Sequence, residues 1–180
     1  VEQVRANLKA LIADANMLAK AAVEGKLATR ADAAKHQGDF RKIVEGVNNT
    51  LDAVIGPLNV AAEYIERISR GDIPQIITES YNGDFNNIKN NLNVLIDANN
   101  DIIQKATMVA NGDLTVNLKK RSEQDGLMEA LSQMVSSLSE IVGEIRSAAD
   151  YVTSGSGQMS ESANMIASGA NQQAASTEEV

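Results

Sequence analysis

The side chains that could carry out a reaction or bind a metal are few in this sequence. The 180 residues contain no cysteine and a single histidine, His36. His36 follows Lys35 in a polar stretch with no accompanying cluster of Asp, Glu or Cys, so we expect a solvated loop residue. No Ser/His/Asp set, phosphate-binding loop or GxGxxG pattern is found. The sequence therefore predicts a protein that is not an enzyme and that uses no cofactor or metal.

The net charge argues against a nucleic-acid partner. The formal net charge is −8, and Lys119-Lys120-Arg121 is the only basic run. A broad nucleic-acid interface needs clustered lysine and arginine, so we expect no nucleic acid to bind. Aromatic residues make up only 3% of the chain and tryptophan is absent. The residues that dominate instead, such as Ala, Leu, Ile and Glu, are typical of long helices and predict an all-α fold.

The apolar stretches and the ends of the chain bear on its cellular location and on whether it is part of a longer protein. No stretch approaches the ~20 apolar residues that span a bilayer, and none has the pattern of a signal peptide. The absence of cysteine is compatible with the cytoplasm. The chain begins within one helical pattern and stops within another, so we expect a fragment of a longer protein.

A unit built around glycine recurs three times. Each copy has a glycine of the kind that ends a helix in the left-handed conformation: Gly25, Gly71 and Gly112. A restart follows after a polar connector, at residues 38–40, 83–85 and 125–127. Ile43, Asn48, Asp52 and Ala53 then match Ile88, Asn93, Asp97 and Ala98. The spacing of 46 and 41 residues between the glycines signals tandem modules. Apolar residues at fixed places are predicted to anchor the connectors: Leu27, Ile73, Ile77, Leu114 and Leu118.

The segments between the connectors have helical periodicity. They cover residues 1–24, 40–70, 85–111 and 127 onwards. Gly56-Pro57 leaves two alternatives open, because proline costs about 3 kcal/mol inside a helix. Either one module hands over to the next at Pro57, or one long helix kinks there. We divide the chain into modules at 1–56, 57–98 and 99–145, followed by a final segment, 146–180.

From Leu127 onwards a heptad seam continues to Val180. A repeat of 3.5 residues keeps one narrow face towards a partner helix and predicts a coiled coil. In the later part of the seam every seventh residue is small: Ala148, Gly155, Ser162, Gly169 and Ser176. This half of the seam fits either a flexible stalk or a weakly packed bundle whose packing can switch.

The length of the connectors predicts parallel helices. Thirteen extended residues reach ~43 Å, whereas a helix of sixteen residues is ~24 Å long. A connector can therefore return the chain to the starting end of the preceding helix. Two helices and a connector cannot bury their apolar stripes alone. We therefore expect a homodimer of tandem parallel four-helix bundles that continues into a long coiled-coil helix.

The glycine-centred unit resembles the HAMP domain, a signal-relay module of bacterial receptors. Gly71-Asp72-Ile73 with Ile77, and Gly112-Asp113-Leu114 with Leu118, match the family pattern of a helix end followed by two apolar anchors. Pro57 stands where that family often has a proline opening its first helix. The resemblance implies three HAMP-like modules that relay a conformational change and have no catalytic role.

The final segment resembles the first methylation helix of methyl-accepting chemotaxis receptors. Small residues flank a Gln or Glu pair at 172–173 and at 178–179. The resemblance implies methylation at Gln172, after deamidation, and at Glu179, with Gln173 and Glu178 as alternatives. It also implies a cytoplasmic location, in a membrane or soluble receptor, and several partners. These are a histidine kinase and its adaptor, reached through a missing part of the chain, and a receptor methyltransferase and methylesterase.

Two other functions fit parts of the sequence. A HAMP array of another sensor, such as a histidine kinase or a cyclase, would share the connectors. A kinase needs a phospho-accepting histidine on a helix, and His36 is in a connector. A structural coiled-coil linker would account for the seam, but it would leave the repeated connectors unexplained.

Overall fold

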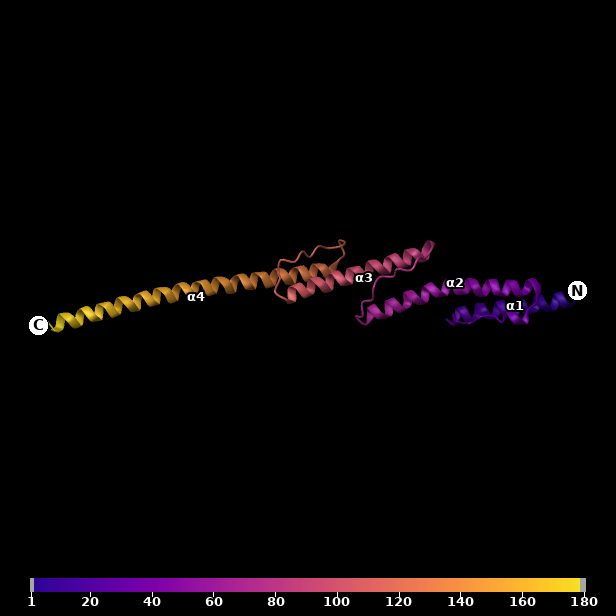
Figure 1. The fold of residues 1–180 in the computed structure, drawn as a ribbon, viewed down its shortest axis with the longest axis horizontal. Helices are drawn as coiled ribbons and strands as arrows, with labels where there is room; N and C mark the ends of the chain where they lie inside the picture. The colour runs from indigo at the N-terminus through magenta and orange to yellow at the C-terminus, as the bar shows by residue number, and fades with distance from the viewer. Residues whose placement is uncertain (1, 179–180) are drawn as a thin grey trace. The chain divides into compact units, whose positions relative to one another are not determined.

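The computed structural model describes the backbone of residues 2–178 and the side chains of residues 2–174. Within this range the chain is helical and has no strand, which confirms the predicted all-α fold (Figure 1). The elements are α1 (Glu2–Val23), the short 3-10 helix η1 (Ala33–Lys35), α2 (Gly38–Ser69), α3 (Gly83–Ala110) and α4 (Gly126–Glu178). Among the described residues, no helix has the length and apolar character needed to cross a membrane.

The chain divides into two compact units, residues 1–101 and 102–180, and α3 contributes to both. In the first unit, α1 and the first half of α2 lie side by side and run in the same direction (Figure 1). The connector between them, residues 24–37, returns along the pair. This is the parallel arrangement that the connector length predicts.

Helix α2 passes through Pro57 without interruption. Of the two alternatives left open by the sequence, the structure therefore has the single long helix. Pro57 lacks the N–H that would bond the carbonyl of Ala53, so one backbone hydrogen bond is missing there. The second helix of the first repeat and the first helix of the second repeat are consequently one continuous helix. In the same way, α3 continues through Asn99-Asn100-Asp101.

The three helix ends before the connectors have the same geometry. The φ angles of Gly25, Gly71 and Gly112 are +73°, +80° and +88°. The N–H of the next residue donates to the carbonyl five positions earlier, at 2.8–3.0 Å: Lys26 to Ala21, Asp72 to Arg67, and Asp113 to Met108. This pair of features is the Schellman motif, in which a left-handed glycine satisfies carbonyls at the helix end.

The restart of α3 differs slightly from the sequence prediction. Aspartate is a common N-cap residue, but α3 begins one residue before Asp84, at Gly83, which has a φ of +53°. Asp84 therefore lies within the first turn. A carboxylate in that turn still interacts favourably with the positive end of the helix dipole.

The second connector packs into a small apolar core between α2 and α3. Ile77 is 3% exposed and clusters with Ala61 of α2 and Leu92 of α3. Val60, Tyr64 and Tyr81 are partly buried against the same cluster. The connector is thus a packed part of the unit, held by an isoleucine that bridges two helices.

We expect Ile77→Ala to lower the free energy of unfolding by about 2–4 kcal/mol, because it leaves a cavity between two helices. The matched control is Ile76→Ala, since the adjacent Ile76 is 48% exposed. The control should change the free energy by less than about 0.5 kcal/mol. Denaturant unfolding followed by circular dichroism measures both. Equal effects of the two substitutions would show that the connector is a passive loop.

Candidate functional site

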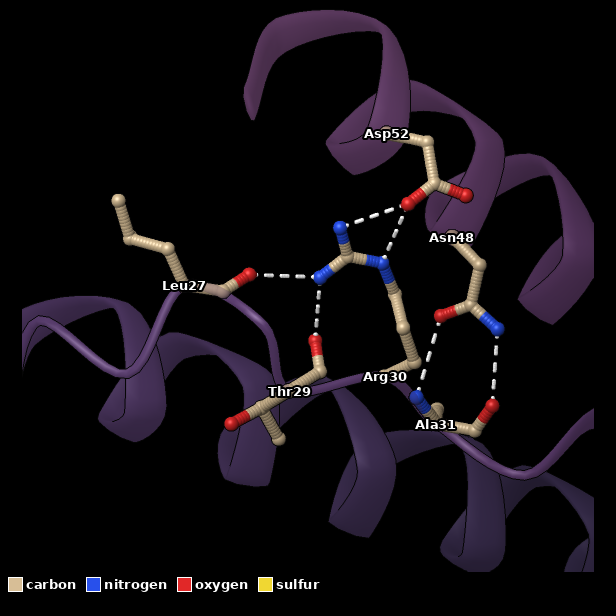
Figure 2. Close-up of polar contacts among 6 residues, drawn as sticks. All are labelled: Leu27, Thr29, Arg30, Ala31, Asn48 and Asp52. Atoms are coloured by element: carbon tan, nitrogen blue, oxygen red, sulfur yellow. Dashed lines mark hydrogen bonds and ion pairs between the residues drawn. The ribbon is translucent and has the colours of Figure 1, made fainter. Parts of the chain in front are cut away.

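The first connector is held to α2 by the side chain of Asn48. Its Oδ1 accepts a hydrogen bond from the Ala31 N–H at 3.1 Å, and its Nδ2 donates to the Ala31 carbonyl at 2.8 Å (Figure 2). An amide side chain has one donor face and one acceptor face, so it pairs with an extended residue as a neighbouring strand would. This asparagine clamp fixes which connector residue lies against which turn of the helix.

The second connector has the same clamp. The Ile77 N–H donates to Asn93 Oδ1 at 2.7 Å, and Asn93 Nδ2 donates to the Ile77 carbonyl at 3.0 Å. Ala31 and Ile77 both lie six residues after their helix-ending glycine, and both asparagines lie nine residues after the Asp of Gly-Asp-Phe. The sequence showed that Asn48 matches Asn93, but it did not show what either residue binds.

The first connector has a further polar contact with α2. Arg30 donates from Nε and Nη2 to Asp52 Oδ1, at 2.9 and 2.7 Å. Its Nη1 also donates to the carbonyls of Leu27 and Thr29, both at 2.7 Å (Figure 2). In the second connector the position of Arg30 is taken by Ile76, so this contact distinguishes the two copies.

His36 corrects the sequence prediction of a solvated loop residue. Its side chain is 2% exposed, and Nε2 lies 2.6 Å from Oδ2 of Asp14 on α1. The correction has a tertiary cause, because Asp14 is 22 residues away in the sequence. The turn η1, capped by a bond from the Ala34 N–H to Asp32 Oδ1, directs His36 towards α1.

The third connector is fastened at its end by Asp125. Its carboxylate accepts bonds from the N–H, Nε and Nη2 of Arg121, and from the N–H of Met128 at 3.2 Å. These hydrogen bonds from Arg121 hold the pKa of the Asp125 carboxyl well below its usual range. Asp125 is thus the N-cap of α4.

The aspartates that follow two of the helix-ending glycines also accept hydrogen bonds. A side-chain hydrogen bond from Arg67 lowers the pKa of the Asp72 carboxyl. Bonds from the hydroxyl and N–H of Thr115 lower the pKa of Asp113. In the first copy Lys26 takes this place, and its Nζ lies 2.8 Å from Glu24 Oε2.

The side chains of the predicted anchors differ in how far they are buried. Ile77 is buried, Leu27 is 43% exposed, and the other three are half-buried: Ile73, Leu114 and Leu118. Pro74, which the sequence analysis did not count as an anchor, is also buried. The described residues include no group of three or more His, Cys, Asp or Glu that could hold a metal.

Three of the four predicted methylation positions lie in the last two turns of α4: Gln172, Gln173 and Glu178. Gln172 and Gln173 are exposed on this helix. Glu178 is the last residue of α4, and Glu179 lies outside the described residues.

Residues 35–101 match the family model of the HAMP domain. The chain contains a HAMP domain. The match runs from the end of the first connector through α2 and the second connector to Asp101 in α3. It therefore contains the Asn93 clamp and the Ile77 core. No curated protein and no solved structure gave a significant match.

A HAMP domain is a signal-transducing linker of sensor proteins, which gives the clamp a context. The clamp consists of two hydrogen bonds to backbone groups, so it does not depend on which side chain the connector presents.

We expect Asn93→Asp to destabilise the HAMP domain by about 1–3 kcal/mol. The substitution keeps the acceptor but removes the donor, so the Ile77 carbonyl loses its partner in a partly buried place. Asn91→Asp is the matched control, because Asn91 is exposed and the added charge is the same. Denaturant unfolding of both variants provides the measurement. A loss no greater for Asn93→Asp than for Asn91→Asp would contradict a structural role of the clamp.

Proposed function

We propose that the chain is the relay region of a chemotaxis-type receptor. In this proposal three tandem HAMP-like modules pass a conformational change from an input domain to a kinase-controlling region, on the cytoplasmic side of the membrane or in a soluble receptor. The observation that carries the proposal is the asparagine clamp, repeated at equivalent positions in two successive connectors. The HAMP domain at residues 35–101 supports it.

The continuity of the helices gives the relay a physical route. Because α2 contains the clamp residue of the first connector and the core residue Ala61 beside the second, both connectors touch the same helix. A helix interior is held by hydrogen bonds in every turn, so rotation or displacement at one connector is carried to the next. Coupling of this kind requires two packings that are close in energy.

Exposed apolar side chains support a homodimer as the working form. Large apolar residues are exposed along all four α-helices, among them Leu8 and Ile12 of α1, Ile65 of α2, Leu95 of α3 and Leu138 of α4. On α4, nearly every described side chain from Ser136 to Ala174 is exposed. A second copy in parallel would cover these surfaces and complete the four-helix bundles.

Methylation would act through charge on the far part of α4. Neutralising a carboxylate in a bundle of acidic helices reduces like-charge repulsion and favours tighter packing. The small residues Gly155, Ser162 and Gly169 weaken the seam beside this region, so a modest change in repulsion can shift the packing. The partners of such a receptor would be a kinase with its adaptor, a methyltransferase and a methylesterase.

We expect single cysteines at Ile65 and at Leu138 to crosslink to their own copies under mild oxidation. Both side chains are exposed within the chain and would meet their equivalents in a parallel homodimer. The chain has no native cysteine, so any disulfide crosslink must form through the introduced cysteine. Glu63→Cys and Ser136→Cys, two residues away and thus on the opposite helix face, are the controls. Crosslinking at the control positions alone, or a monomer in sedimentation at tens of micromolar, would contradict this assembly.

We expect Glu179, and Gln172 after deamidation, to be methyl-esterified in the parent receptor. Mass spectrometry of peptides covering residues 160–180, with and without the methyltransferase, tests this. Glu179→Gln should act on kinase output as methylation does, because both remove the charge, whereas Glu179→Asp should not. If Glu179 stays unmodified in a receptor that is methylated elsewhere, the site assignment fails and the relay proposal rests on the connectors alone.

A further inference from the structure

We propose that the His36–Asp14 pair makes the packing of the first connector depend on pH, whereas the second connector is insensitive. His36 is the single histidine of the chain, and its ring links the connector to α1. Histidine is the side chain that changes charge between about pH 5 and 8. The proposal does not depend on the relay function, because it concerns the attachment of one connector.

The second repeat has an apolar pair in the same place. His36 is two residues before Gly38, as Tyr81 is two residues before Gly83. Asp14 is eleven residues before the helix-ending Gly25, as Val60 is eleven before Gly71. Val60 and Tyr81 both pack against the cluster of Ala61, Ile77 and Leu92. At these two equivalent positions the first repeat therefore has a hydrogen-bonded, titratable pair, whereas the second has two side chains that pack against an apolar cluster.

The surroundings of the pair determine whether a lower pH strengthens or weakens the attachment of the first connector. The His36 side chain is 2% exposed and the Asp14 side chain 25%. Asp14 borders a small cavity of about 40 Å³ that is otherwise lined by Leu11, Ala15, Leu18, Ala31, Val44 and Val47. With a neutral imidazole, the partly buried Asp14 carboxylate faces an uncharged donor. Protonation of His36 places a cation against the carboxylate and makes the contact an ion pair, which is stronger than a bond in which only the acceptor is charged.

No other charged group close to the pair should mask this response. In the connector, Asp32 and Lys35 lie 3.9 Å apart, and at the start of α2 Asp39 and Lys42 lie 2.9 Å apart. All four side chains are more than half exposed. Solvent and salt screen the charges of such exposed pairs. On α1, Asp14 is the ionisable residue in contact with the ring.

Hydrogen exchange of the two connectors in the full 180-residue chain tests the proposal. The protection of residues 28–37, divided by that of residues 74–82, cancels the intrinsic effect of pH on exchange. We expect this ratio to rise on the order of fivefold from pH 8 to pH 5.5, as a bond with one charged partner becomes an ion pair. A ratio that stays constant within a factor of two would overturn the proposal.

Two variants separate the pair from other titrations. Asp14→Asn keeps an acceptor of the same shape and removes the charge, so the rise of the ratio at low pH should be lost or reversed, because a charged His36 would then be buried without a counter-charge. The helix content should be unchanged. The double variant D14V/H36Y installs the apolar pair of the second repeat, and its ratio should be independent of pH. If the double variant does not fold, Asp14→Asn decides alone. A full pH response retained in either folded variant would overturn the proposal.

Discussion

The arrangement of this chain depends on holding an extended connector against two parallel helices. A connector of this kind has no strand beside it, so its backbone groups need partners from side chains or solvent. Asn48 and Asn93 supply those partners at one residue in each of the first two connectors. With that residue fixed, the apolar side chain of Ile77 can reach the groove between α2 and α3, where it is buried.

The two clamped connectors share a plan but differ in the contacts around the clamp. The first is surrounded by polar pairs, Arg30 with Asp52 and His36 with Asp14. The second is surrounded by apolar side chains, among them Tyr64 and Tyr81. Polar pairs respond to protonation and salt, whereas apolar packing does so only weakly. Repeats with one backbone geometry can therefore differ in what alters their packing.

Successive repeats are joined by continuous helices. There is no linker between the second helix of one repeat and the first helix of the next, and even Pro57 lies within a helix. Helices α2 and α3 are thus each shared by two connectors, and the glycine at the end of each is the point where the direction of the chain changes. The local geometry of Gly25, Gly71 and Gly112 is the same, so each connector leaves its helix in the same way.

The sequence by itself determined the features that depend on short-range spacing. Helical periodicity gave the four α-helices, and the connector length was sufficient for parallel neighbours. The tertiary structure decided which distant groups meet. It buried His36 against Asp14, paired each asparagine with a connector residue sixteen or seventeen positions away, and made Asp125 the cap of α4. Spacing shows which residues share a face of one helix. The partner of a polar side chain is instead set by the path of the connector across the helices. A local sequence pattern does not predict that path.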